Sequence, residues 1–308
     1  MRRCQSRACR HHWLDPAPVA AELPRLYETY YTHRSTSGPS AGGLRGCYEG
    51  ALQALAARHL GYQPQPAPVA ATLLSYLLAL HPGRRGEALM RVLFLPRVAG
   101  HRMLEVGFGD GRTLRRLSQL GWNAVGVDFD PVAIEQARAS GISAFAGALE
   151  DQDLPPHSFD AVLAGHVVEH LADPLRTLRA AARLLVAGGY LVLVTPNAIS
   201  PGHAWFGIDW RGLEPPRHLN VFTRSSLAAL VERAGLVVER NRGTGRTQGI
   251  LRPSLDLRRK RLRGSPMDGP ISWKNRLGFD ITECVQAGWA ALDPDRCEEI
   301  VLVARSRG

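Results

Sequence analysis

One short segment constrains the fold of this chain more than any other. An apolar run of strand type, Met103–Val106, is followed by a glycine-rich turn and then by a helix expected over Thr113–Leu120. The turn has glycine at alternate positions, Gly107, Gly109 and Gly111. Glycine lets the backbone turn sharply and approach a ligand closely, and the helix that follows offers free N–H groups. The segment therefore predicts a ligand-binding turn at the edge of a sheet.

The glycine spacing separates two classes of nucleotide ligand. A dinucleotide fingerprint has the pattern G-x-G-x-x-G, whereas here Gly111 comes one residue early and Arg112 stands in the last position. Asp128 follows Gly111 by seventeen residues, at the end of the next expected strand, Ala124–Val127. A carboxylate at that strand tip accepts hydrogen bonds from ribose hydroxyls. The pattern favours a nucleoside ligand and disfavours an oxidoreductase that binds a dinucleotide.

Strand and helix signals alternate through residues 99–240. Alternation of this kind predicts a parallel sheet with helices on both faces. We expect a helix to begin at Pro131, and another to run from Asp173-Pro174 to Gly188-Gly189. The further strands are expected over 159–164, 190–194 and 236–239, with a helix over 225–234 and a last strand over 298–304.

Four zones follow from these signals. Residues 1–45 form a leader with Cys and His near its start, in which Asp15 is expected to cap a helix running toward Tyr31. Residues 46–98 form a helical cap, residues 99–240 with 297–305 form the core, and residues 241–296 form a basic insertion. Two leucine stripes mark the cap: Leu52, Leu55 and Leu60, then Leu73, Leu74, Leu77 and Leu78.

The formal charge of +10 bears on possible partners. Nucleic-acid binding is one interpretation of such an excess, and residues 252–263 concentrate it. Only Lys260 and Lys274 are lysines, so the skew toward arginine equally fits codon bias in the source. We favour a solvated or substrate-facing basic surface. No apolar run approaches the roughly 20 residues of a membrane-spanning helix, and a cytoplasmic protein is expected.

The five cysteines do not predict a disulfide framework, because their number is odd and their spacing irregular. Cys4 and Cys9 lie close to His11 and His12, which raises the alternative of zinc. Structural zinc sites usually present two close ligand pairs, and here no clear second pair follows. We expect no metal.

Two motifs of this chain are similar to those of a known family. E-x-G-x-G-x-G over 105–111, followed by Gly126-Val127-Asp128, resembles the first two motifs of class I S-adenosylmethionine-dependent methyltransferases. The segment 215–223 is similar to a signature of the group that includes ubiquinone-pathway O-methyltransferases and uncharacterised bacterial relatives. The resemblance covers residues 99–240 firmly, the ends loosely and 241–296 hardly at all. Further matching segments are 158–162, 166–170, 187–189 and 195–197.

The resemblance implies an α/β fold: a doubly wound, Rossmann-like sheet of seven strands. The sheet is expected to be mostly parallel, with an antiparallel C-terminal strand and an N-terminal helical extension. The methyl donor would be S-adenosylmethionine, and the acceptor is expected to be a small molecule whose identity the sequence does not give. Two alternatives stay open: an RNA or protein methyltransferase that uses the basic insertion, and a nucleoside-binding protein without catalysis.

The resemblance also assigns cofactor contacts. Glu105 would orient the glycine turn or meet the methionine amine through water, Asp128 would hold the ribose, and Phe129 would lie on the adenine. The family often has a polar residue where this chain has Ala148, so adenine recognition falls to the backbone of Leu149 or to Glu150. The full set implied is Glu105, Gly107, Phe108, Gly109, Gly111, Asp128, Phe129, Leu149, Glu150 and His166.

Histidines are the candidate catalytic groups. His166 would stand at the tip of the fourth strand beside the sulfonium, and His218 is the second candidate. A neutral imidazole accepts a proton near pH 7, although we expect both to position substrate rather than act as bases. His166, Glu169 and His170 stand where some quinone and RNA methyltransferases hold a metal with E-x-x-E-H. We favour hydrogen bonding within the core for Glu169 and His170.

The segment after the fifth strand is expected to cover the acceptor. It carries Trp205, Phe206, Trp210 and Arg211. Two tryptophans there suggest a planar or sugar-like acceptor, although two buried core aromatics would give the same pattern.

Overall fold

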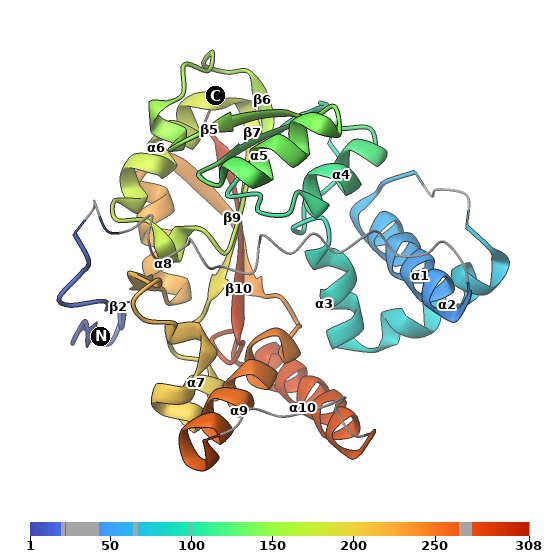
Figure 1. Ribbon diagram of the computed structural model, residues 1–308, viewed down its shortest axis with the longest axis vertical. Coiled ribbons are helices and arrows are strands. Elements are labelled where there is room, and N and C mark those ends of the chain that lie inside the picture. The colour runs from blue at the N-terminus through green and yellow to red at the C-terminus, as the bar shows by residue number, and fades with distance from the viewer. Residues whose placement is uncertain (20–21, 23–42, 64–66, 99, 265–272, 308) are drawn as a thin grey trace.

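A seven-stranded sheet forms the centre of the computed structural model, which describes residues 1–19, 22, 43–63, 67–98, 100–264 and 273–307 (Figure 1). The strand order is β5-β4-β3-β6-β7-β10-β9. The strands β3 to β7 run parallel, and β10 is antiparallel to both of its neighbours. The predicted fold is thereby confirmed. The bounds are β3 Arg102–Val106, β4 Asn123–Asp128, β5 Ser143–Ala146, β6 Phe159–Gly165, β7 Leu185–Pro196, β9 Leu236–Gly243 and β10 Glu299–Ser306.

The central strands are buried on both faces, which is why they read as nearly continuous apolar runs. Successive side chains of β3 enter opposite layers: Met103 joins one core cluster and Leu104 the other. The first cluster includes the inner faces of α4 (Arg112–Gln119) and α5 (Pro131–Ala139). The second includes those of α6 (Pro174–Leu184) and α8 (Arg224–Arg233).

Three helices precede the sheet and pack on the first cluster: α1 (Gly43–Leu60), α2 (Val69–Leu80) and α3 (Pro82–Met90). The first leucine stripe is buried. The second stripe lies on a helix, α2, as its spacing predicts, but Leu73 and Leu77 are 62% and 66% exposed. The helix α2 instead packs through its small residues, among them Ala71 and Ser75, so most of its leucines face outward.

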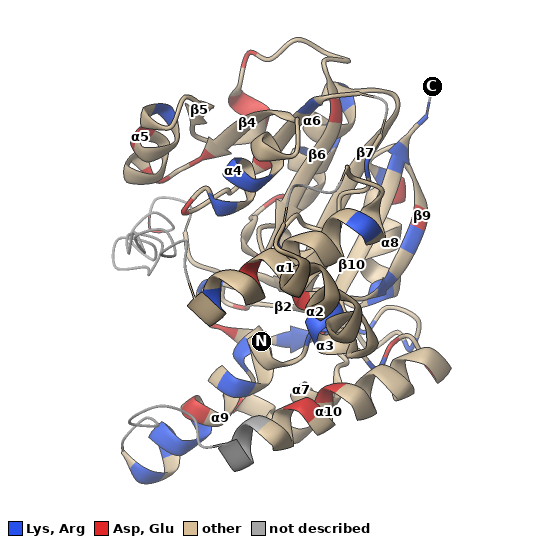
Figure 2. Ribbon diagram, turned by 90° about the vertical axis from the view of Figure 1, so that its right-hand side faces the viewer, with Lys and Arg blue, Asp and Glu red and all other residues tan. Residues whose placement is uncertain are grey.

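The predicted basic insertion contains two further helices below the sheet in Figure 1, α9 (Gln248–Arg263) and α10 (Trp273–Leu292). The helix α9 packs against the short helix α7 (Pro201–Phe206). Figure 2 shows the basic residues gathered along α9. Two of them, Arg258 and Arg261, form ion pairs with Asp209, so part of the basic run stabilises the fold itself.

The N-terminal residues form a second, small sheet. β1 (Arg2–Arg3) pairs with β2 (His12–Trp13), and β2 pairs with β8 (Asn220–Val221). The helix expected between Asp15 and Tyr31 falls largely outside the described residues.

One predicted helix end was wrong. The helix α6 ends at Leu184, and Gly188-Gly189 lie inside β7, where the register with β6 shifts. Gly188 has a φ of +71°, so the glycines permit an irregularity in the strand rather than a helix cap. Among the described residues, no helix has the length and apolar character needed to cross a membrane.

The contrast between α1 and α2 predicts unequal costs for the same substitution. Leu52→Ala empties a fully buried position and should lower the free energy of unfolding by about 2–5 kcal/mol. Leu73→Ala removes an outward-facing side chain and should change it by less than about 0.5 kcal/mol. Urea denaturation measures both, and equal losses would contradict the placement of α2.

Candidate active site

The C-terminal ends of β3, β4 and β6 meet at one edge of the sheet, and the antiparallel strands bring two more segments there. Glu299, the first residue of β10, pairs with Pro196, the last residue of β7. Ile300 pairs with Gly243 at the end of β9. Ligands of open α/β sheets bind at this edge. Residues that are far apart in the sequence therefore surround one site.

The glycine turn after β3 has the backbone conformation that the sequence predicts. Gly107, Gly109 and Gly111 have φ values of +65°, +53° and +67°, a region that favours glycine. A Cβ on Gly107 would lie 2.5 Å from Cγ2 of Val167, so glycine is also required there for space. The turn consequently exposes main chain where side chains would otherwise stand.

Asp128 connects this turn to the tip of β4. Its Oδ2 accepts the Gly109 N–H at 2.8 Å, and its Oδ1 accepts the Asp130 N–H at 2.9 Å. Burial raises the pKa of Asp128, and these backbone donors oppose that rise. A carboxylate has about four lone-pair sites, so both oxygens retain acceptor capacity for a diol.

Glu105 lies beneath the turn and is buried. Its pKa is raised well above the usual value by burial and by the nearby charges of Asp128 and Asp110. Thr113 and the backbone N–H of Leu114 donate hydrogen bonds to this carboxyl group, which links it to the first turn of α4. Its Oε2 has no hydrogen-bond partner among the described residues. Such an orphaned atom at the turn fits a polar ligand group nearby.

Two of the residues predicted to contact the cofactor differ in what their side chains contact. The Phe108 ring is buried, and a Cβ on Gly126 would lie 2.5 Å from it, so only the Phe108 main chain remains for a ligand. Phe129, by contrast, is 71% exposed beside Asp128 and offers an open aromatic face. Stacking on an adenine is consistent with that exposure.

The predicted adenine-binding segment is the short helix η4 (Leu149–Asp151). The Leu149 side chain belongs to the core, and Glu150 accepts a hydrogen bond from Thr177 at 3.0 Å. Sequence reasoning missed Gln152, whose Nε2 donates to the carbonyls of Ala146 and Ala148 at 2.9 Å each. Gln152 fixes the strand exit where the family often has a polar residue.

His166 lies between two buried carboxylates from distant parts of the chain. Its Nδ1 is 3.3 Å from Oε1 of Glu169, and its Nε2 is 3.3 Å from Oε1 of Glu299. Burial acts to lower the pKa of His166, but the two carboxylates outweigh it and raise this pKa to about 10. The imidazole is therefore an imidazolium at neutral pH. Both ring nitrogens then carry a proton, so neither can accept another. This favours a positioning role for His166 over proton abstraction.

Both carboxylates have further partners. Glu169 Oε2 accepts a hydrogen bond from Thr195 at 2.9 Å, and Glu299 Oε2 accepts one from Thr244 at 3.1 Å. Arg246 Nε lies 3.5 Å from the same oxygen of Glu299. Despite burial, His166 holds the pKa of Glu169 at about 2, and Arg246 with His166 does the same for Glu299. Glu299 was not predicted from the sequence, where it appears only as an acid beginning a strand.

His218, the second predicted catalytic residue, is buried. Its Nδ1 donates to the Gly212 carbonyl at 2.7 Å, and burial lowers its pKa to about 4. It is thus neutral at pH 7. Its neighbours are Glu169 and the His170 ring, which stacks edge-on at 4.6 Å between centroids.

Glu169, His170 and His218 have ligand atoms within 4.8 Å of one another. The Nδ1 of His170 lies 3.1 Å from the Arg217 carbonyl, and the Nε2 of His218 lies 3.6 Å from Oε2 of Glu214. This is the composition of a divalent-metal site. The carboxylate is nevertheless already bound by His166 and Thr195 without a cation. The expectation of no metal stays a prediction.

One other group of three ligand-type residues occurs in the described part of the chain: His81, Asp280 and Glu283. Asp280 pairs there with Arg84, which competes with a cation. Neither group includes Cys4 or Cys9.

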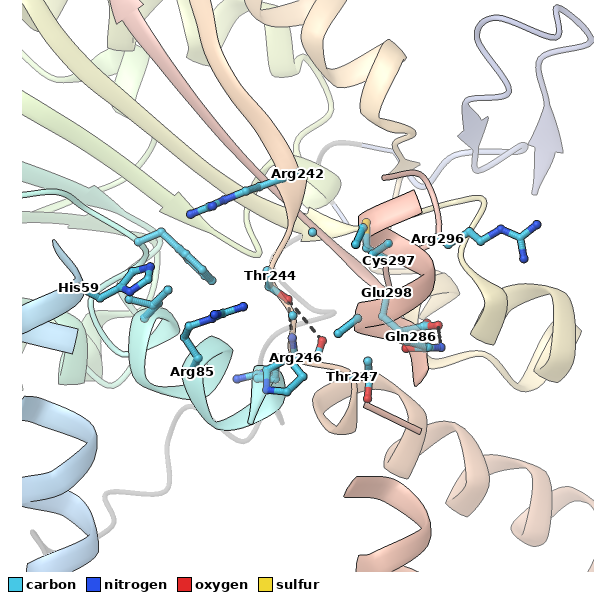
Figure 3. Close-up of a pocket in the computed structure, with 18 residues that line it drawn as sticks. His59, Arg85, Arg242, Thr244, Arg246, Thr247, Gln286, Arg296, Cys297 and Glu298 are labelled. Atoms are coloured by element: carbon cyan, nitrogen blue, oxygen red, sulfur yellow. Dashed lines mark hydrogen bonds between the residues drawn. The ribbon is translucent and has the colours of Figure 1, made fainter. Parts of the chain in front are cut away.

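A cavity of about 350 Å³ opens beside this edge of the sheet (Figure 3). Its wall includes Thr244 and Arg246, the residues that contact Glu299. Phe94 also lines it, and the neighbouring Leu93 packs against Gly165, directly before His166. Contacts through Glu299 therefore connect the wall of the cavity to His166.

The aromatic segment predicted to cover the acceptor has mixed roles. Trp210 is fully buried, and its Nε1 donates to Glu298 at 3.1 Å, so it is a core residue. Arg211 pairs with Glu214 within the same loop. Trp205 is 77% exposed. Of the two tryptophans, only Trp205 is exposed in a way that would let it cover a ligand.

Known proteins resemble this chain in sequence. A family model described as a methyltransferase domain matches residues 72–241. A probable S-adenosylmethionine-dependent methyltransferase of Mycolicibacterium smegmatis is 30% identical over 160 residues, which is 50% of this chain and 59% of that protein. A ubiquinone biosynthesis O-methyltransferase of Xanthomonas euvesicatoria pv. vesicatoria is 32% identical over 155 residues, 46% of this chain and 65% of that protein.

The chain spans less than two thirds of the length of these curated relatives. Among solved structures, an S-adenosylmethionine-dependent methyltransferase from Mesorhizobium loti is 18% identical, with a TM-score of 0.48 over 71% of this chain and 97% of that one.

The ion pairs of His166 predict a pH dependence of stability. The folded pKa, about 10, lies above the ordinary 6.5, so the stabilisation is complete below pH 6.5 and is lost as pH rises toward 10. The difference in unfolding free energy between wild type and His166→Gln should shrink between pH 6.5 and 10. A His166 ring that titrates near 6.5 by NMR would contradict the arrangement.

The hydrogen bonds of Glu169 predict indifference to metal removal. Dialysis against EDTA should leave the melting temperature and the affinity for S-adenosylmethionine unchanged, because Glu169 is held by His166 and Thr195. Elemental analysis of the purified protein checks the starting state. If dialysis lowers the melting temperature or the affinity, and zinc or magnesium restores it, then Glu169, His170 and His218 bind a cation.

Proposed function

Because this chain belongs to the methyltransferase-domain family, whose members include S-adenosylmethionine-dependent enzymes, we propose that it methylates a small-molecule acceptor. The observation that carries the proposal is the hydrogen-bonded unit of Asp128 and the glycine turn. It combines exposed main chain, an acceptor for a diol and the open ring of Phe129, in the order that a sulfonium nucleoside requires.

In the proposed complex the three parts of the donor fall to separate residues. Asp128 accepts the ribose hydroxyls, Phe129 covers the adenine, and the main chain at Gly107 and Gly109 faces the methionine portion. Glu105 holds the turn in place through the start of α4. S-adenosylmethionine supplies a methyl group on a positively charged sulfur, which leaves with the S–CH₃ bonding pair as a neutral thioether.

The chain's main contribution is to align the acceptor and exclude water. As an imidazolium held by Glu169 and Glu299, His166 is a rigid donor rather than a base. An acceptor hydroxyl or carbon acid must then lose its proton to another group or to water, whereas an ionised oxygen or a free amine needs no base before attack. The proposed role of His166 is to position the reacting groups.

The size of the cavity favours a small molecule over a macromolecule. A volume of about 350 Å³ lies at the lower end of the range of small-ligand sites, about 300–1,000 Å³. In the basic run that would bind an RNA or protein substrate, Arg258 and Arg261 already form ion pairs with Asp209. Transfer of radiolabelled methyl to a metabolite extract, and not to RNA or protein fractions, is the expected outcome of a substrate screen.

Asp128 provides the direct test of the donor site. Asp128→Ala should weaken the binding of S-adenosylhomocysteine about ten- to a hundredfold, because two charge-assisted hydrogen bonds to the ribose and the anchor of Gly109 are lost. The matched control is Glu135→Ala, an exposed acid on α5. Calorimetry measures both variants. Wild-type affinity in Asp128→Ala, with its fold retained by circular dichroism, would refute the ribose assignment.

A further inference from the structure

The cavity lined by Thr244 and Arg246 has an uneven distribution of charge. Figure 3 shows His59, Arg85 and Arg242 on one side and Cys297, Glu298 and Gln286 on the other. The three basic residues come from α1, α3 and β9, so three separate elements converge to place them together. The lining also includes apolar side chains such as Leu89 and Phe94.

The arginines of this cavity fall into two kinds. Arg246 pairs with Glu299 at 3.5 Å and Arg296 with Asp293 at 3.3 Å, which neutralises both. Within the described part of the chain, no carboxylate lies within 4.0 Å of Arg85 or Arg242, and neither forms a hydrogen bond to another side chain. Two cations thus face the cavity without a counter-charge.

The unpaired charges act on one another. Partial burial lowers the pKa of Arg242, and so do the charges of Arg240 and Arg85. The pKa of His59 is lowered by partial burial and then by Arg85 and Arg242. The side chains of Arg85 and Arg242 are both exposed to solvent, and a bound anion would reduce the repulsion between their charges.

Glu298, the carboxylate on the opposite wall, does not pair with Arg85 or Arg242. Glu298 Oε1 accepts hydrogen bonds from the Gly202 N–H at 2.7 Å and from Gln286 at 2.9 Å, and its Oε2 accepts one from Trp210. Burial raises its pKa. The hydrogen bonds of Glu298 therefore link α7 and α10 to the start of β10. They leave the charges of Arg85 and Arg242 without a carboxylate partner among the described residues.

We propose that this cavity binds the methyl acceptor through an anionic group, a carboxylate or a phosphate, held by Arg85 and Arg242. The inference rests on the proposed function, and it names the substrate class. An arginine fork matches both kinds of oxyanion, and Leu89 and Phe94 would contact an apolar body between the anion and the reacting atom. The reacting atom would point toward the edge of the sheet where Glu299 and His166 lie.

Calorimetry on protein saturated with S-adenosylhomocysteine tests the site. Inorganic phosphate and benzoate are the two probes, and they distinguish the phosphate from the carboxylate. Arg85→Gln and Arg242→Gln should each lower the affinity for whichever probe the wild type prefers by about tenfold or more. Arg179→Gln, an exposed arginine on α6 at the other face of the sheet, is the matched control and should have no effect.

The inference is overturned if the wild type binds neither probe, or if both arginine variants bind as the wild type does. Binding of S-adenosylhomocysteine is measured in the same preparations and should be equal in all four proteins, so failure of the donor site is seen separately. A second readout uses the labelled product of the metabolite screen. Retention on an anion exchanger at pH 8 is expected, and an uncharged product would overturn the inference while leaving the methyltransferase proposal intact.

Discussion

The hydrogen bond from the Gly109 amide to Asp128 is the interaction on which the rest of the site depends. It joins the turn after β3 to the tip of β4, two strands that are already paired in register from Arg102 to Val106. Because the sheet fixes the strands, one carboxylate is enough to set the shape of the turn. The exposed main chain, the start of α4 and the open face of Phe129 then take their positions relative to that unit.

The sequence predicted this part of the molecule well because its information is local. Alternating glycines, a following helix and a carboxylate at the next strand tip are each visible within thirty residues of one another. The seven strands and the antiparallel C-terminal strand were expected from the resemblance. The outward leucines of α2 were not predictable from periodicity, since a helix packed through Ala71 and Ser75 shows the same leucine stripe as one packed through its leucines.

The environment of His166 was also beyond sequence reasoning, and for a different reason. Glu169 is three residues away, but Glu299 reaches the ring only because β10 enters the sheet antiparallel to β7. The antiparallel pairing of β10 with β7 therefore supplies the second carboxylate that keeps the candidate base, His166, protonated. Glu299 also contacts Thr244 and Arg246, which line the cavity. The proposed acceptor site is thus formed by residues that are far apart in the chain.

The central claim is that the glycine turn and Asp128 select a sulfonium nucleoside rather than a dinucleotide. Isothermal titration calorimetry of the wild-type protein with S-adenosylmethionine and, separately, with NAD tests this most directly. The account predicts saturable binding of S-adenosylmethionine and no measurable heat of binding for NAD. Binding of NAD alone would contradict it.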